Sequence, residues 1–347
     1  MDDTYNFDDR LSQGSILAER RPPVPWFDHE LATLVIEETP RRPCIVPVGA
    51  RLLTLGQSWL SNGPLLDEMV RLTKARALSL EPYVYDLTYH TGAHQTGWTD
   101  NQDRFARLMS LLRHSARVLT ESKQVENELQ KLRAARGLAF TTRRTGLRGR
   151  SISEGDRGTA PRYERDSFVL FISSFNKRKN HDFLVHVWRE LYETWIKPTK
   201  RPHRLVLVGE VQEEHKYGDA TFRAELRRSN IDVHTMLSDG VLAHLMQRCA
   251  FTVYPSVQEG WGLPVQESLE YGKICLVSAS LPVAQEITNA ALIKISPTDF
   301  YGWYEALKSW LGNPSMRRAF SVRAREYQPP TWHDIASAIL DSTGEPP

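Results

Sequence analysis

The sequence has few cysteines, no long apolar run and almost no surplus of charge. Its three cysteines, Cys44, Cys249 and Cys275, are scattered through 347 residues, so they match neither a zinc site nor a disulfide framework. With 44 basic and 42 acidic residues the net charge is +2, which excludes the basic field typical of nucleic-acid-binding proteins. No stretch approaches the ~20 apolar residues of a membrane span, and the acidic N-terminus does not resemble a signal peptide. We therefore expect a soluble, cytoplasmic protein.

The sequence does contain a regular alternation of short apolar runs and amphipathic segments. In the first half this pattern predicts an apolar run at 44–56, a helix at 64–80, a strand at 83–89, a helix at 101–114, a strand at 116–122 and a helix at 123–135. In the second half it predicts strands at 167–174, 204–209, 231–237, 251–255 and 273–279, helices following most of these strands, and three C-terminal helices at 299–311, 315–326 and 332–340. Such alternation predicts βαβ units around parallel sheets.

The composition divides the chain into five parts. We expect an irregular segment at 1–40 with one short helix near 28–38, an α/β domain at 41–142, a linker at 143–165, a second α/β domain at 166–330 and a final helix within 331–347. The linker is rich in Arg, Gly and Ser, which favours a solvated hinge over a patch for an anionic membrane surface.

One loop of the second domain, YPSVQEGWGLPVQESLEYGK, carries two glutamates, Glu259 and Glu267. We expect it to leave a strand and to enter a helix at Pro264, with Glu267 in the first helical turn. Gly260 and Gly262 allow the backbone to approach another group closely. A glutamate in a first turn is also favoured by the helix dipole alone, so this loop by itself supports ligand binding and a purely structural role equally.

A second loop, FISSFNKRKNHDF, places three cations before a predicted helix whose N-cap we expect to be Asn180. Cations at a helix N-terminus oppose the dipole unless an anion lies there. We interpret Arg178 and Lys179 as a phosphate site and Lys177 as a solvated surface charge.

Together these stretches resemble the donor-binding domain of the retaining GT-B glycosyltransferases in the family called glycosyl transferases group 1. The resemblance rests on KRKNH, LVLVG, LSDGVLAHLMQRCAFTVYPS, EGWGLPVQE and LPVAQEI, which occur in the family's order. It is dense over 166–337 and looser over 45–132. It implies an α/β fold of the GT-B type, with two doubly wound Rossmann-type domains facing across a cleft. Residues 166–330 would bind a nucleotide sugar, 41–142 would form the acceptor side, and the final helix would cross back to the first domain.

The resemblance also implies roles for individual residues. Lys179, with Arg178, would neutralise the donor diphosphate, Glu259 would face the transferred sugar and Glu267 the ribose. The donor site would be completed by Ser174, Gly209, Gly260, Trp261, Gly262 and Leu263. The resemblance implies no metal or other cofactor, because members of the family need none and the sequence contains no acidic metal motif. It also implies that the leaving phosphate helps to deprotonate the acceptor on the same face.

On the acceptor side the resemblance indicates Asp86 and His90, although Asp86 also suits a structural role and His90 a surface one. The implied reaction moves a hexose, such as mannose, from a nucleotide diphosphate sugar to a glycan or lipid-linked acceptor, and a lipid-linked acceptor is compatible with peripheral contact at the inner membrane face.

The first domain is shorter than the family pattern, since only some forty irregular residues precede its first matching stretch. An incomplete sheet exposes its edges. The alternative is therefore a non-catalytic nucleotide-sugar-binding module, or a fragment, that needs a partner chain.

Overall fold

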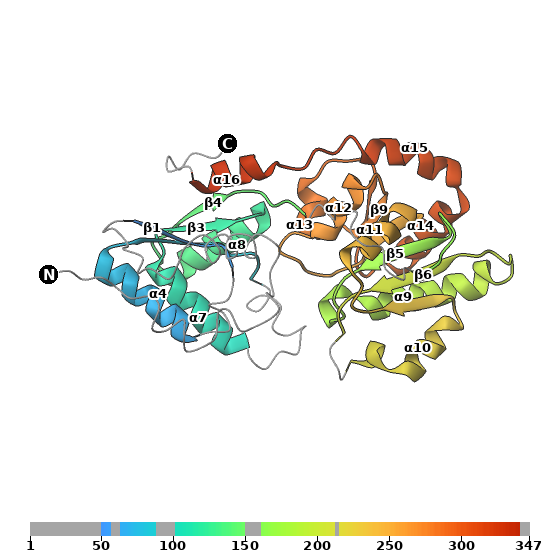
Figure 1. Ribbon diagram of the computed structural model, residues 1–347, viewed down its shortest axis with the longest axis horizontal. Coiled ribbons are helices and arrows are strands. Elements are labelled where there is room, and N and C mark those ends of the chain that lie inside the picture. The colour runs from blue at the N-terminus through green and yellow to red at the C-terminus, as the bar shows by residue number, and fades with distance from the viewer. Residues whose placement is uncertain (1–49, 57–62, 88–100, 150–160, 212–214, 341–347) are drawn as a thin grey trace.

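The computed structural model describes residues 50–56, 63–87, 101–149, 161–211 and 215–340. These residues form two α/β units that lie side by side, and the chain ends on the first unit (Figure 1). The helix predicted at 28–38 and the candidate residue His90 lie outside the described residues, as does most of the segment on which the expectation of an incomplete first domain depends.

The second unit is built on a six-stranded sheet with the order β10-β9-β8-β5-β6-β7. Every neighbouring pair is parallel. The strands are β5 (Phe168–Ile172), β6 (Arg204–Val208), β7 (Ile231–His234), β8 (Phe251–Tyr254), β9 (Cys275–Ser278) and β10 (Leu292–Ile295). From β5 the chain moves outward in one direction to β7, and from β8 it moves outward in the other direction to β10. The boundary between β5 and β8 is therefore the topological switch point, where such sheets bind ligands.

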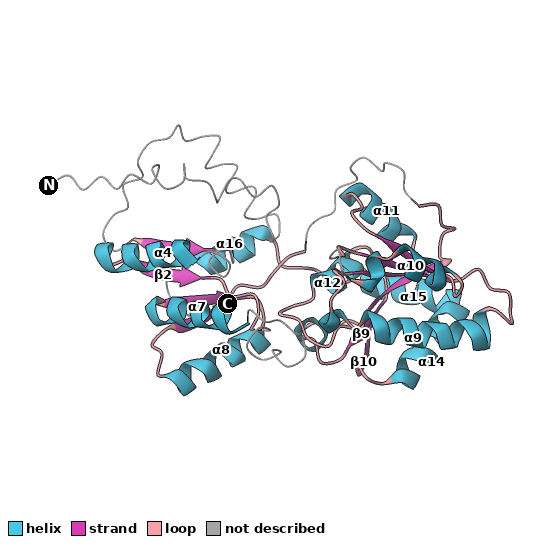
Figure 2. Cartoon of the chain, turned by 90° about the horizontal axis from the view of Figure 1, so that it is seen from below, coloured by secondary structure: helices cyan, strands magenta, loops and turns pink. Residues whose placement is uncertain are grey.

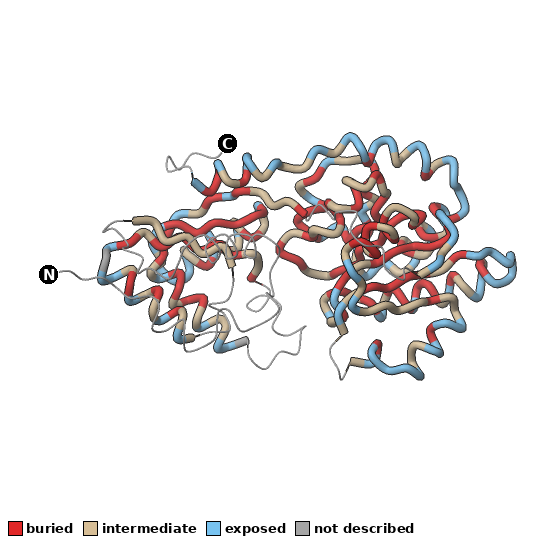
Figure 3. The backbone as a smooth tube through the Cα atoms, in the orientation of Figure 1, coloured by how far each residue is buried: buried red, intermediate tan, exposed pale blue. Residues whose placement is uncertain are grey.

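Helices cover both faces of this sheet because its strands are apolar on both sides. Val169 and Phe171 of β5 face a core shared with α9 (His181–Leu191) and α14 (Phe300–Gly312). Phe168 and Leu170 face the opposite core, which includes α11 (Asp239–Arg248). Figure 2 shows α11 on one side of the strands and α9 and α14 on the other. In Figure 3 the strands are seen to be buried between partly exposed helices.

The first unit contains two parallel pairs, β1 (Arg51–Thr54) with β2 (Ser79–Pro82) and β3 (Arg117–Thr120) with β4 (Thr141–Arg144). Bridges from Leu80 to Ser115 and from Tyr83 to Leu119 join the pairs. One core contains side chains of α4 (Gly63–Arg76), α7 (Asn101–His114) and α8 (Lys123–Arg136).

The C-terminal helix α16 (Trp332–Leu340) packs on the first unit, although it follows the last helices of the second. Its Ile335 and Ile339 are buried against Tyr83 and Leu119. Arg51 of β1 donates hydrogen bonds of 2.8 Å to the carbonyl oxygens of Ile339 and Leu340. The two units are thus connected by the chain twice.

The predictions of a helix at 64–80 and a strand at 83–89 were misplaced. Helix α4 ends at Arg76, and the strand is β2 at 79–82. Glu81 of β2 is buried. Its carboxylate pairs with Arg51 and Arg117 of the neighbouring strands, each at 2.7 Å. These partners lie far away in the sequence, so the local pattern did not identify a strand that contains a buried charge.

Three elements were missed. The strand β4 occupies the end of the predicted first domain and the start of the predicted linker, the helix α10 (Ala220–Arg227) follows β6, and β10 follows α13 (Pro282–Glu286). The sequence of β4 is TTRR, which has no apolar alternation. Another helix of this unit, α15 (Pro314–Ala324), matches the prediction at 315–326 closely.

Candidate functional site

The loops that carry the predicted donor residues leave the two strands at the switch point. After β5 the chain forms a short 3-10 turn, Lys177–Lys179. After β8 it forms the loop 255–262, which contains Glu259. Because β5 and β8 pair in parallel, their carboxyl ends place these two loops next to each other.

Hydrogen bonds fix the first loop against the second. Asn180 lies at the predicted N-cap of α9, but it has a positive φ of 63° and its side chain makes no capping bond to the helix. Instead the amide donates to the carbonyl oxygens of Pro255 and Pro297 at 3.1 and 3.0 Å. The Val257 amide donates to the carbonyl of Arg178 at 2.8 Å. These bonds join the loops after β5, β8 and β10 and hold the cationic turn in place.

Four side chains from these loops form what we call the Lys179 cluster: Arg178, Lys179, Tyr254 and Glu259. Lys179 Nζ lies 2.5 Å from Glu259 Oε1, and Arg178 Nη1 pairs with the other oxygen of the same carboxylate. Lys179 Nζ also donates to the hydroxyl of Tyr254 at 3.1 Å. Lys179 and Glu259 are each only 8% exposed. The structure therefore brings the three residues predicted to be catalytic into direct contact.

Burial and charge act in opposite directions on this cluster. Burial lowers the pKa of Lys179, against the attraction of Glu259. Burial alone would raise the pKa of Glu259, but the charges of Lys179 and Arg178 hold it below its usual value. Burial raises the pKa of Tyr254, which keeps its hydroxyl a donor. Within the cluster one carboxylate faces two cations, so a further anion is electrostatically favoured there.

The glycines predicted to line the donor site each sit where a side chain would collide. A Cβ on Gly209 would lie 1.9 Å from the carbonyl oxygen of Ser173, so the end of β6 can approach the loop after β5. Gly262 has a φ of 116° and is the N-cap of α12 (Leu263–Glu270). A Cβ on Gly260 would lie 1.9 Å from the carbonyl oxygen of Tyr85 in the first unit. Gly260 thus permits contact between the two units, and its contact with a donor stays a prediction.

Glu267 lies in the second turn of α12 rather than in the first. The helix begins at Leu263, one residue before the predicted start, and has no acidic residue in its first turn. Glu267 is half-buried and packs against Gly149. A Cβ added to Gly149 would lie 2.7 Å from Glu267 Cγ. The helix dipole, which falls off within the first turn, therefore explains this glutamate less well than the sequence suggested.

The other predicted donor residues lie around the same loops. Trp261 donates from its indole nitrogen to Gln266 Oε1 at 2.9 Å and packs partly buried against the core. Leu263 starts α12 and is half-buried. Ser174 is exposed, and its hydroxyl accepts a hydrogen bond of 3.1 Å from Asn176. No sequence signal beyond the resemblance distinguished these positions.

On the acceptor side, Asp86 lies at the boundary between the units. Its Cβ would be 3.0 Å from a Cβ on Gly260, and its charge is among those that raise the pKa of Arg178. Sequence reasoning missed Glu121, which directly follows β3 and is 4% exposed. Burial raises the pKa of Glu121 well above its usual value. Only its position at the carboxyl end of a strand hinted at a special role.

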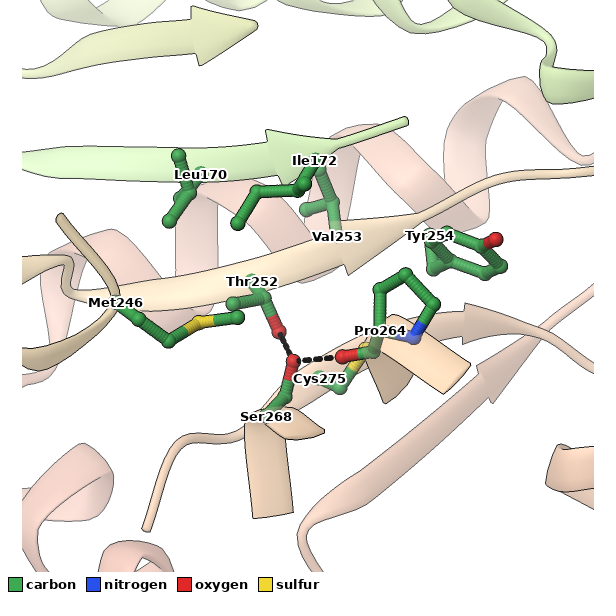
Figure 4. Close-up of a pocket in the computed structure, with 9 residues that line it drawn as sticks. All are labelled: Leu170, Ile172, Met246, Thr252, Val253, Tyr254, Pro264, Ser268 and Cys275. Carbon is green, nitrogen blue, oxygen red and sulfur yellow. Dashed lines mark hydrogen bonds between the residues drawn. The ribbon is translucent and has the colours of Figure 1, made fainter. Parts of the chain in front are cut away.

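A small cavity lies beside the cluster, between β5, β8 and α12 (Figure 4). Its lining includes Tyr254 and Cys275, and Ser268 bridges it by accepting from Thr252 at 2.8 Å and donating to the Pro264 carbonyl at 2.6 Å. With a volume of about 10 Å³ it has room for one water molecule at most. It is a packing defect rather than a substrate site.

The described residues show neither a metal-binding cluster nor a membrane-spanning helix. They contain no group of three or more His, Cys, Asp or Glu side chains placed to hold a metal ion. In the same ranges no helix has the length and apolar character required to cross a membrane. Metal independence stays a prediction.

Comparison with known proteins gives a consistent picture. The family described as "Glycosyl transferases group 1" matches residues 153–327. The chain is 24% identical over 149 residues to the O-antigen chain mannosyltransferase RfbU of Salmonella typhimurium, an alignment that covers 42% of this chain and 39% of that protein. It is 30% identical over 128 residues to the serotype-specific mannosyltransferase WbdA of Escherichia coli, covering 34% of this chain and 14% of that protein. The chain thus aligns with well under half the length of either relative.

Solved structures confirm the GT-B-type α/β fold with parallel sheets. WaaG, described as a glycosyltransferase involved in lipopolysaccharide biosynthesis, superimposes with a TM-score of 0.55 at 15% identity, over 79% of this chain and 77% of that one. OtsA without ligand gives a TM-score of 0.60 at 10% identity, over 90% and 73%. At such low identities the likeness concerns the fold alone.

Proposed function

Because the chain belongs to the glycosyl transferases group 1 family, we propose that it is a retaining glycosyltransferase. It moves a hexose of the mannose type from a nucleotide diphosphate sugar to a glycan or lipid-linked glycan, without a metal ion. The observation that carries the proposal is the Lys179 cluster, where the buried Lys179 and the half-buried Arg178 share one carboxylate at the switch point of a parallel sheet. The choice of mannose is supported by the names of the matched relatives RfbU and WbdA.

In the proposed reaction the donor diphosphate lies against Lys179 and Arg178. The bond between the anomeric carbon and the diphosphate oxygen breaks, and the acceptor hydroxyl forms the new bond on the same face. The acceptor proton passes to the departing phosphate oxygen. Lys179 and Arg178 stabilise the negative charge that develops on the leaving group. Glu259 and Glu267 orient the sugar and the ribose, so the protein contributes mainly positioning and charge.

A thermal-shift panel of nucleotides and nucleotide sugars, GDP-mannose included, tests donor binding. A ligand present at about a hundred times its Kd stabilises the protein by ~2.7 kcal/mol. For one domain of the size of the second unit that raises the Tm by roughly 5–10 °C. Absence of a shift with every nucleotide contradicts the proposal, and binding without turnover would favour the non-catalytic module.

Turnover is then measured as release of nucleotide diphosphate from the donor that binds. Lys179→Ala should lower kcat by about 100-fold or more, because it removes charge stabilisation of the leaving group. The matched control is Lys177→Ala, since Lys177 lies in the same turn but is exposed. Glu267→Ala should mainly raise the KM for the donor. Equal turnover in Lys179→Ala and wild type would refute the assigned role.

A further inference from the structure

Glu121 is a buried acid at the boundary of the two units that the proposed chemistry does not use. Among the described residues its Oε1 has no hydrogen-bond partner. Its Oε2 accepts a long hydrogen bond of 3.4 Å from the hydroxyl of Thr120, and the residue's own backbone amide also donates to the carboxylate. An unsatisfied buried polar atom costs free energy, so its presence calls for an explanation.

The group that faces Glu121 belongs to the other unit. A Cβ built on Gly260 would lie 2.8 Å from Glu121 Oε1, 1.9 Å from the carbonyl oxygen of Tyr85 and 3.0 Å from Cβ of Asp86. We call the loop after β8, residues 255–262, the donor loop. The donor loop therefore rests on the first unit through Gly260, and the next residue toward the N-terminus is Glu259 of the Lys179 cluster.

The charges around Glu121 favour its neutral form. Burial contributes most to its raised pKa, and the negative charges of Asp86, which follows β2, and Glu286, which ends α13, add to it. Tyr83, at the end of β2, is buried in the same region, and burial followed by the charge of Glu121 raises the pKa of its phenol. An ionised Glu121 would be desolvated beside two other acids, so water would be drawn to its carboxylate and would weaken the contact between Gly260 and the first unit.

We propose that Glu121 is a positioning residue for the transfer reaction: its buried side chain seats the donor loop through Gly260 and so fixes where the Lys179 cluster stands relative to Asp86. The reaction in this statement rests on the proposed function, whereas the seating of the loop does not. The contact is direct because Gly260 has no side chain that would hold its backbone away from Glu121 and Tyr85.

Hydrogen exchange of the donor loop in the full-length chain tests the seating without any substrate. In the wild type the loop amides should lose about tenfold in protection, corrected for intrinsic rates, as rising pH ionises Glu121. Glu121→Gln, an uncharged substitute of the same shape, should keep its protection over this range. The control Glu305→Gln removes an exposed carboxylate of α14 and should follow the wild type. Loop protection that responds to pH equally in wild type and Glu121→Gln would overturn the proposal.

Kinetics test the consequence for turnover, with GDP release from GDP-mannose as the probe. In the wild type kcat should fall at high pH, as the contact between the donor loop and the first unit weakens. Glu121→Gln should keep kcat and KM near wild type and should not show this fall. Glu121→Ala should lower kcat about tenfold with the donor KM unchanged, because displacement of a reacting group costs rate rather than donor affinity. A kcat as low in Glu121→Gln as in Glu121→Ala would contradict a positioning role. If the wild type releases no nucleotide diphosphate from any donor, the proposed function fails, and the exchange experiment still decides on the seating.

Discussion

Replacement of Glu259 by glutamine should destabilise the free protein while improving its binding of a bare nucleotide diphosphate. The substitution keeps the shape of the side chain but removes the carboxylate that lies 2.5 Å from Lys179. The 8% exposed lysine then has the Tyr254 hydroxyl at 3.1 Å as its nearest remaining polar contact in the cluster. Removing one partner of a buried ion pair costs ~3–5 kcal/mol. At ~2–4 °C per kcal/mol for a domain of the size of the second unit, which contains the cluster, the Tm should fall by about 6–20 °C.

The matched control is Glu193→Gln. Glu193 pairs with Lys197 at 2.7 Å, but both side chains are more than half exposed, so its loss should cost at most ~0.5 kcal/mol. Calorimetric titration with GDP measures the second effect. In the wild type a phosphate competes with Glu259 for the two cations, whereas in Glu259→Gln it does not, so GDP should bind about tenfold more tightly, which is ~1.4 kcal/mol. GDP carries no sugar, so the lost sugar contact does not enter this measurement.

Two outcomes would refute this reasoning. One is a Tm of Glu259→Gln within about 2 °C of the wild type, as expected for an exposed pair. The other is weaker GDP binding by the variant, because it would show that Glu259 does not compete with the diphosphate.

Three further predictions concern the boundary and the buried acid–base groups. Gly260→Ala places a Cβ 1.9 Å from the Tyr85 carbonyl oxygen, so turnover should fall by up to about 100-fold, while calorimetry should find the GDP affinity unchanged. Turnover equal to that of the wild type would mean that the reaction does not need contact between the units. His181 is 4% exposed, stacks 4.3 Å from Phe175, and burial lowers its pKa to about 3. The unfolded state therefore takes up the proton first, and urea unfolding should show stability falling below about pH 6.5 by up to ~1.4 kcal/mol per pH unit more than in His181→Phe. The raised pKa of Glu121 makes stability depend on pH in the opposite direction, because the folded state holds the proton more tightly. Wild-type stability should therefore fall relative to Glu121→Gln as pH rises above about 4.3. For either residue, curves of stability against pH that run parallel in wild type and variant would contradict the assigned pKa shift.

The fold was predictable where hydrophobic periodicity was strong. The buried face of α9 consists of Leu184, Val187, Trp188 and Leu191, and their spacing shows the helical period directly in the sequence. The strand β2 was misplaced because Glu81 owes its burial to Arg51 and Arg117, which only the folded chain brings together. Short elements such as β10 carry too few residues to show a period.

The site was partly predictable because its motifs occur in order along the chain. The resemblance named Lys179, Arg178 and Glu259, which the structure places in contact. It did not anticipate that Glu259 itself supplies the anion which the cations were expected to receive from a ligand. Glu121 was missed because a single acid after a strand has no sequence signature, and its importance depends on burial against Gly260.

The most direct measurement of the central claim is a crystal structure of the chain with the nucleotide diphosphate that binds most tightly. The account predicts that a β-phosphate oxygen lies about 2.7–2.9 Å from Lys179 Nζ or the Arg178 guanidinium, as charge-assisted hydrogen bonds do, with the ribose hydroxyls on Glu267. A diphosphate bound elsewhere, with the ion pair between Lys179 and Glu259 unchanged, would contradict it.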